Sequence, residues 1–221
     1  GVAGSPVRFT SGATDRDGSL VRFEWDLDGD GAAEHVTGGP DLDVVPRRSG
    51  TVGGGRVTVV DDTGLTDAAQ VPAVAVAGRP PAMALRAGPG APSGQPVVLD
   101  ASRSADPDEG GRIVSFRFDL PGGRVVEGPS PTVTYTPERP GRYEARVTGT
   151  DEEGRSAQAT VAFDVLNRAP AVAPQASPER VGVGSDVRLR AGAADADGRI
   201  ARVAWDLDAD GSAELEGEEV V

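Results

Sequence analysis

Residues 15–31, DRDGSLVRFEWDLDGDG, carry the pattern that decides the fold. From Val21 to Leu27 every second residue is apolar, and charged side chains stand between them. Side chains of a β-strand point alternately to its two faces, so a period of two indicates a strand with one buried and one solvated face. We therefore predict a central strand at 20–28, with Trp25 in the core of a sandwich.

The same pattern returns twice along the chain. Residues 195–211 read DADGRIARVAWDLDADG, which places Trp205 180 residues after Trp25. Halfway between, residues 106–120 read DPDEGGRIVSFRFDL, with Phe118 at the tryptophan position. The repeat is therefore about 90 residues long, the size of one immunoglobulin-like sandwich. We predict two further central strands with a buried aromatic residue, at 113–120 and 200–207.

Proline-bearing links divide the chain, because proline stiffens a short connection between domains. They stand at Gly78-Arg79-Pro80-Pro81 and Asn167-Arg168-Ala169-Pro170. The predicted domains are residues 1–78, which lack a first strand, residues 79–167, which are complete, and residues 168–221, which hold only the N-terminal part of a repeat. Missing strands leave sheet edges and apolar faces open. We therefore expect the chain to be a piece of a longer array, with outer repeats less stable than the middle one.

Composition supports an all-β fold and excludes several functions. Valine outnumbers leucine 29 to 11, and β-branched side chains suit a pleated surface. The net charge of -13 makes nucleic acid a poor partner. The absence of cysteine removes disulfides and thiolate sites, and no apolar run is long enough to span a membrane. All 22 basic residues are arginine, a bias typical of a GC-rich genome, from which we infer a bacterial source.

The acidic turn and tryptophan strand, together with GRYEARVT at 141–148 and DEEG at 151–154, resemble the polycystic-kidney-disease (PKD) domain. The resemblance covers essentially the whole chain, as one complete and two partial copies. It implies tandem immunoglobulin-like β-sandwiches of an extracellular, cell-surface or secreted protein. The middle repeat departs from the pattern, with Phe118 for tryptophan and Pro121-Gly122-Gly123 for the acidic run.

The acidic run after each tryptophan strand is the clearest candidate for ligand binding. Carboxylates spaced two apart in a glycine-bearing turn can direct several oxygens at Ca²⁺. The position of the bidentate glutamate of a helix-loop-helix calcium site is Thr37 or Gly217 instead. A calcium site and a solvated turn therefore both stay open. The candidate metal ligands are Asp26, Asp28, Asp30 and Glu34 in the first repeat and Asp206, Asp208, Asp210 and Glu214 in the third.

Other candidates favour structural roles. A second acidic turn, Asp15 and Asp17 with its copy Asp195 and Asp197, is expected to shape a loop rather than to join the metal site. Trp25 and Trp205 fall on the buried side of their strands, which argues against a sugar-stacking platform. Tyr143, at the start of a late strand, is typical of a tyrosine corner. The single histidine, His35, is expected in an exposed loop.

No catalytic constellation accompanies these features, and we predict that the chain is not an enzyme. The favoured function is an extracellular spacer or adhesion module of a larger secreted or surface-anchored bacterial protein, with calcium as a possible rigidifying ion. The alternative is an accessory domain that binds a polysaccharide or protein substrate for an attached hydrolase. In either case the nearest partners are neighbouring domains of the same chain.

Overall fold

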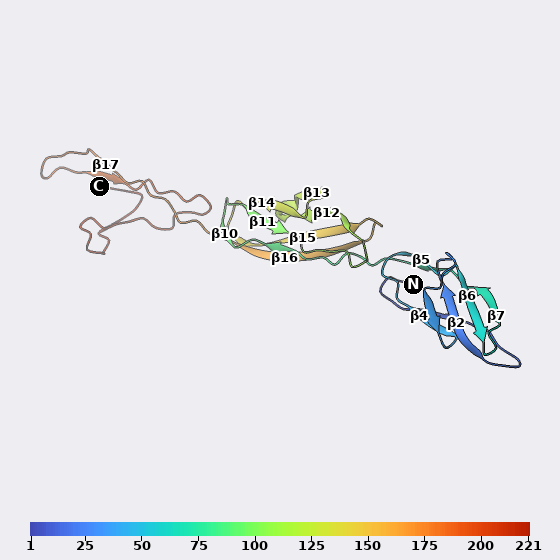
Figure 1. The fold of residues 1–221 in the computed structure, drawn as a ribbon. Helices are drawn as coiled ribbons and strands as arrows, with labels where there is room; N and C mark the ends of the chain where they lie inside the picture. The colour runs from blue at the N-terminus through green and yellow to red at the C-terminus, as the bar shows by residue number, and fades with distance from the viewer.

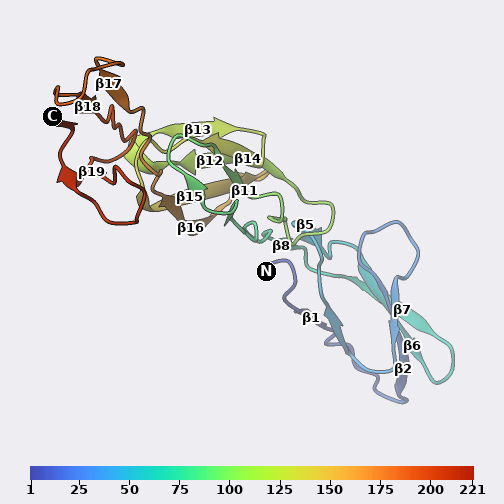
Figure 2. The same cartoon turned by 90° about the vertical axis from the view of Figure 1, so that its left-hand side faces the viewer.

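The structure is a computed structural model that describes residues 1–221. It is all-β, and a single 3₁₀ turn, η1 (Pro121–Gly123), is its one helical element. The three repeats follow one another in a row, coloured blue to cyan, green to yellow and brown to red (Figure 1), and the order is the same in the view turned by 90° (Figure 2). None of its helical segments is long and apolar enough to cross a membrane.

The middle repeat is an immunoglobulin-like sandwich of two sheets. The larger sheet has the strand order β10-β16-β15-β12-β13 and the smaller one β14-β11-β9. The strands are β9 (Arg86–Ala87), β10 (Ala91–Pro92), β11 (Val97–Asp100), β12 (Ile113–Asp119), β13 (Val125–Gly128), β14 (Thr132–Tyr135), β15 (Gly141–Asp151) and β16 (Ser156–Leu166).

The alternation predicted for the central strand places its aromatic residues in the core. Phe116 and Phe118 of β12 are buried, while Val114 on the opposite face is 42% exposed. Phe118 lies opposite Val147 of β15, and both are buried between the two sheets. Ten buried residues form this core: Val97, Leu99, Ala101, Phe116, Phe118, Leu120, Ala145, Val147, Phe163 and Val165.

The first repeat is built on the same plan around Trp25, which is 1% exposed. Trp25 lies opposite Val57 of β6, as Phe118 lies opposite Val147, and its indole N–H donates to the Thr37 hydroxyl at 3.1 Å. No strand corresponding to β9 extends the β1–β4 pair. The strands are β1 (Val7–Thr10), β2 (Leu20–Asp26), β3 (His35–Thr37), β4 (Asp41–Val44), β5 (Gly50–Val52), β6 (Arg56–Asp61), β7 (Thr66–Gln70) and β8 (Val74–Val76).

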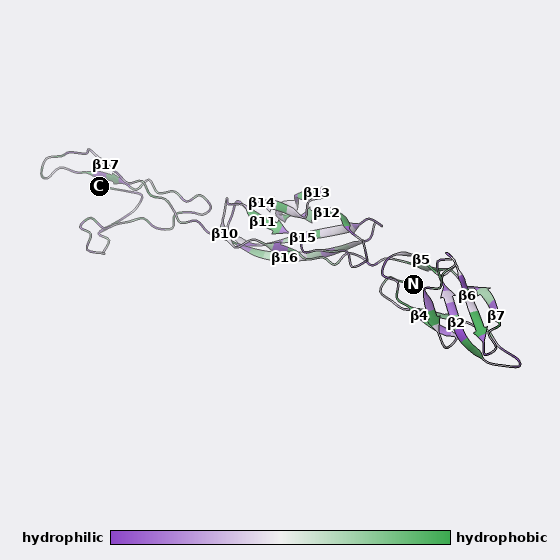
Figure 3. Ribbon diagram, viewed as in Figure 1, coloured by the Kyte–Doolittle hydropathy of each residue, from purple (hydrophilic) through white to green (hydrophobic).

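The third repeat has short strands and almost no core. Ala191 is its one buried hydrophobic residue. Figure 3 shows hydrophobic and hydrophilic residues interleaved along the strands of the first two repeats, whereas the third is mostly loop. Its strands are β17 (Gln175–Ser177), β18 (Arg188–Arg190), β19 (Ala204–Trp205), β20 (Leu215–Glu216) and β21 (Glu219–Val220).

The prediction that Trp205 is buried in a strand at 200–207 is wrong. β19 spans only Ala204–Trp205, and Trp205 is half-buried. In the other repeats the central strand pairs on one side with a long strand, β6 or β15, whereas β19 pairs only with β20. Without that second partner the strand shortens and one side of its aromatic residue stays open.

Of two smaller expectations, one differs from the structure and one agrees with it. His35 is the first residue of β3, paired with Trp25 and half-buried, so it does not lie in an exposed loop. Tyr143 behaves as predicted for a tyrosine corner, because its hydroxyl donates to the Arg139 backbone carbonyl at 2.8 Å. Its ring stacks on Phe163 at a centroid distance of 5.9 Å, which links the corner to the core.

Truncation of the central aromatic residue should unfold its repeat. Phe118→Ala removes a fully buried ring and should lower the free energy of unfolding of the middle repeat by about 3–5 kcal/mol, as measured by urea denaturation. Val114→Ala, in the same strand but on its solvated face, is the matched control and should cost less than about 1 kcal/mol. Equal losses for the two variants would contradict the assignment of the buried face.

Candidate metal centre

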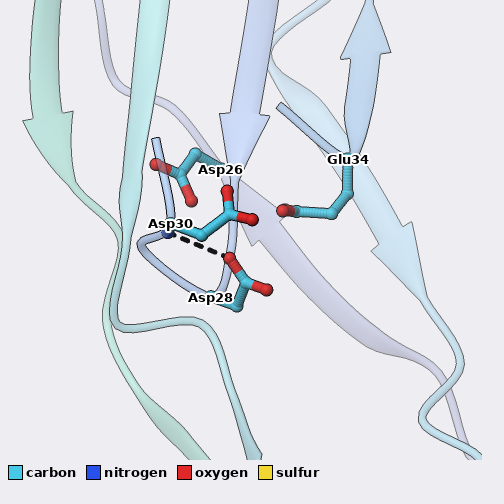
Figure 4. A group of neighbouring side chains, drawn as sticks. All are labelled: Asp26, Asp28, Asp30 and Glu34. Atoms are coloured by element: carbon cyan, nitrogen blue, oxygen red, sulfur yellow. Dashed lines mark hydrogen bonds between the residues drawn. The ribbon is translucent and has the colours of Figure 1, made fainter. Parts of the chain in front are cut away.

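The four acidic side chains predicted as ligands in the first repeat converge. The carboxylates of Asp26, Asp28, Asp30 and Glu34 each offer an oxygen, and these oxygens all lie within 4.8 Å of one another. Asp26 ends β2, the next two follow in the turn, and Glu34 reaches in from the residue before β3 (Figure 4). Oxygens bound to one Ca²⁺ at 2.3–2.6 Å are separated by no more than about 5 Å, so the spacing suits that ion.

Backbone amides hold the carboxylates in place. Asp26 is buried and accepts bonds from Gly29 N at 2.7 Å and from Gly31 N at 3.1 Å. Glu34 accepts from Leu27 N at 2.6 Å, which ties the strand that enters the turn to the strand that leaves it. Gly29 and Gly31 have φ of 80° and 96°, a left-handed region that glycine enters at little cost.

The cluster concentrates negative charge. Two unit charges about 5 Å apart repel each other by about 1 kcal/mol in water, and the four carboxylates form several such pairs. Arg56 is the one cation within salt-bridge distance, with Nε 3.9 Å from Asp26 Oδ2. The donors are all hard oxygens, which fit Ca²⁺ in chemistry as well as in spacing.

The third repeat reproduces this cluster. Oxygens of Asp206, Asp208, Asp210 and Glu214 lie within 4.8 Å of one another, and Glu214 accepts from Leu207 N at 2.6 Å. One difference is Ala209, which replaces Gly29 and has a φ of 63°. A left-handed conformation costs a non-glycine residue about 1 kcal/mol, so this copy of the turn is strained where the first is not.

The middle repeat has a different turn at the same place. η1 follows Leu120, whose amide donates to Arg124 O at 2.8 Å while its carbonyl accepts from Gly123 N at 3.2 Å. Backbone groups close this turn without carboxylates, and no acidic cluster forms there.

The second acidic turn does not belong to the acidic clusters. Its first aspartate holds the turn in each repeat: Asp15 Oδ1 accepts from Asp17 N, Asp106 Oδ1 from Asp108 N and Asp195 Oδ1 from Asp197 N. The second aspartate has another role in two of the repeats. Asp108 and Asp197 accept bonds from the linker that precedes their repeat.

The linker arginines are contact residues that sequence reasoning missed. Arg79 N and Nε donate to Asp108 at 2.8 and 2.7 Å, and Arg168 N donates to Asp197 at 3.0 Å. The separation is 29 residues in both joints. This constant spacing was visible in the sequence once the repeats had been aligned.

Comparisons with known proteins agree with this architecture. The family model of the PKD domain matches residues 82–163. Residues 82–163 form a PKD domain. This PKD domain coincides with the repeat that has the largest core cluster.

Two relatives are proteins of Vibrio cholerae. The chain is 34% identical over 112 residues to pre-pro-metalloprotease PrtV of two Vibrio cholerae serotype O1 strains, a match that covers 50% of this chain and 11% of the relative. Similar solved structures include the PKD1 domain of Vibrio anguillarum Epp (23% identity, 39% of this chain and 94% of the other, TM-score 0.33). The PKD1 domain of the Vibrio cholerae metalloprotease PrtV is another (25% identity, 39% and 98% of the two chains, TM-score 0.31).

The carboxyl of Asp108 titrates below its usual range. Burial would raise its pKa, but hydrogen bonds from the Arg79 side chain and amide, together with the charges of Arg79 and Arg155, outweigh burial and lower it. A carboxyl whose pKa is lower in the folded state stabilises the fold at pH values above its unfolded pKa of about 3.9, and loses this contribution as pH falls through the folded pKa.

Asp108→Asn should therefore lower the melting temperature of the chain at pH 7 and have progressively less effect below pH 4. Differential scanning calorimetry at pH 7 and at pH 3 measures the change in melting temperature caused by the substitution. Asp17→Asn is the matched control, because Asp17 occupies the same turn position with no arginine bonded to it, and it should change the melting temperature less at pH 7. An effect of Asp108→Asn that is equal at pH 7 and pH 3 would contradict the electrostatic origin.

Proposed function

We propose that the chain is a non-catalytic spacer of a larger secreted or surface-anchored bacterial protein. The observation that carries the proposal is the arrangement of the repeats in a row (Figure 1), with each linker hydrogen-bonded to the repeat that follows it. Such bonds oppose the motion that is otherwise the default between domains. The PKD assignment of the middle repeat and the match to part of a pre-pro-metalloprotease support a role as one module among several.

A spacer must keep its ends apart. Small-angle X-ray scattering of the 221-residue chain should give a pair-distance distribution with a long tail, typical of repeats in a row. The distribution should stay the same as salt is raised from low to physiological concentration. A compact distribution, or a profile that fits only a broad ensemble of mutual orientations, would refute the spacer function.

The alternative of a substrate-binding accessory domain has less support. A sugar-stacking platform needs an exposed aromatic face, whereas Trp25 is buried and Trp205 is anchored by an indole N–H bond to Gly217 O at 2.9 Å. The open groove beside β1 and β7 has core residues in its lining, among them Phe9, Trp25 and Val57. Binding of a polysaccharide detected by calorimetry would favour this alternative.

We further propose that the acidic clusters bind calcium and thereby rigidify the outer repeats. The support is the repetition of four converging carboxylates in two repeats and their hard-oxygen chemistry. Asp26, Asp28, Asp30 and Glu34 would hold one ion, and Asp206, Asp208, Asp210 and Glu214 a second. A bound cation would remove the mutual repulsion of the carboxylates and tie the two strands that flank each turn.

Millimolar calcium should raise the melting temperature of the first repeat, because a ligand that binds only the folded state stabilises it. We expect a dissociation constant on the order of 10⁻⁴–10⁻³ M, as in extracellular modules. The double substitution Asp28→Asn with Asp30→Asn should abolish the calcium-induced rise in the melting temperature of the first repeat. The control is Asp119→Asn, beside the turn of the middle repeat that holds no carboxylates, and it should leave this rise unchanged. Identical melting curves in calcium and in a chelator would rule the site out.

A further inference from the structure

The two joints between repeats are built from the same parts. In each, the backbone amide of the linker arginine donates to an aspartate of the next repeat: Arg79 to Asp108 Oδ2 at 2.8 Å and Arg168 to Asp197 Oδ2 at 3.0 Å. The first joint adds an ion pair from Arg79 Nε to Asp108 Oδ1 at 2.7 Å, with the two side chains 36% and 9% exposed. A partly buried, charge-assisted pair of this geometry is stronger and more directional than a surface pair.

The repeat before the linker supplies the other side of each joint. The Arg79 guanidinium lies on Gly4, where a β-carbon would come within 3.0 Å of Nη1, and the Arg168 guanidinium lies on Gly94, where a β-carbon would come within 3.2 Å of Nη2. Both glycines are left-handed, with φ of 81° and 73°. The linker arginine is thus held between a glycine turn of one repeat and an acidic turn of the next.

Further bonds cross each joint. In the first joint Glu109 N donates to Arg47 O at 2.9 Å, and the Ser49 hydroxyl donates to the Glu153 carboxylate, which also pairs with Arg155. In the second joint the hydroxyl of Ser93, a buried residue beside Gly94, donates to Asp197. Both joints therefore connect the two repeats directly as well as through the linker.

The first repeat provides the same acidic turn, and no bond from another repeat reaches it. Asp15 holds the turn through Asp17 N and Gly18 N, as Asp195 does through Asp197 N and Gly198 N. The carboxylate of Asp17 accepts no bond and is exposed, whereas Asp108 and Asp197 are half-buried. The turn geometry is therefore independent of the joint, and the second aspartate is the group that the joint uses.

We infer that Asp108 and Asp197 are docking residues for the linker arginine 29 positions before each of them, and that this contact fixes the orientation of successive repeats. The partner that this surface fits is an arginine-bearing linker that leaves a repeat beside its glycine turn. The inference deepens the spacer proposal and rests on it for its biological meaning. Without the contact, the joint would retain only its proline-bearing link and the few bonds at its edge.

The chain contains no cysteine, so two introduced cysteines are the only thiols to which spin labels can be attached. The labelling sites are introduced by Leu65→Cys in the first repeat and Val98→Cys in the middle repeat. Both residues are exposed and lie outside the joint. Pulsed electron spin resonance between labels at these sites reports the distribution of distances across the first joint. In the unaltered background we expect a narrow distribution, and Asp108→Ala should broaden it at least about twofold, because interdomain motion is the default when the interface is small.

Two further variants make the result decisive. Asp17→Ala removes the same turn residue where no linker docks and should leave the distribution unchanged. Arg79→Gln removes the guanidinium of the linker, outside the sandwich core, but keeps the backbone amide bond to Asp108; it should broaden the distribution, less than Asp108→Ala does, and should add nothing in the double change. If Asp108→Ala fails to fold, the Arg79→Gln variant decides the test.

Unchanged distributions in both Asp108→Ala and Arg79→Gln would overturn the docking role, as would equal broadening by Asp17→Ala. If the distance distribution stays narrow in these variants and X-ray scattering still shows an elongated chain, the docking contact is refuted and the spacer function stands. A broad distribution in the unaltered background would contradict both.

Discussion

Pairing of the central strand with its long neighbour is the contact on which the rest of each repeat depends. In the first repeat β2 pairs with β6 and in the middle repeat β12 pairs with β15, which places Trp25 or Phe118 between two sheets. In the third repeat the central strand pairs only with β20, spans two residues and leaves its tryptophan half-buried. Burial of one large aromatic side chain contributes several kcal/mol, a large part of the stability of a small domain.

The acidic clusters depend on the same strand. Asp26 is buried because it ends β2 against Arg56 of β6, and Glu34 is positioned because β3 pairs back onto β2. The turn is thus held from both sides by the sheet, and its carboxylates converge despite their like charge. The middle repeat closes the same position with backbone hydrogen bonds alone, so the fold does not require the cluster, and the chemistry of the cluster is free to serve a ligand.

In the second acidic turn, at the start of each repeat, the two aspartates have different roles. The first accepts backbone amides and shapes the loop, and the second is left to face outward. In the middle and third repeats this second carboxylate accepts a bond from the linker arginine. A repeated sequence can in this way build both a domain and its joint to the previous domain from one motif, which suits the spacer role that we propose.

The sequence by itself determined the all-β class, the period of the repeat and the buried faces of the central strands in the first two repeats. Those properties follow from local alternation and from spacing along the chain. It also identified the eight carboxylates of the clusters, because ligands spaced two apart in a turn are brought together by local geometry. Only the tertiary structure decided that Trp205 stays half-open, since its burial depends on a partner strand and not on its own alternation. The contact of Arg79 with Asp108 could likewise not be predicted from either segment alone. The two residues are 29 positions apart, and only folding brings both to the joint between adjacent repeats.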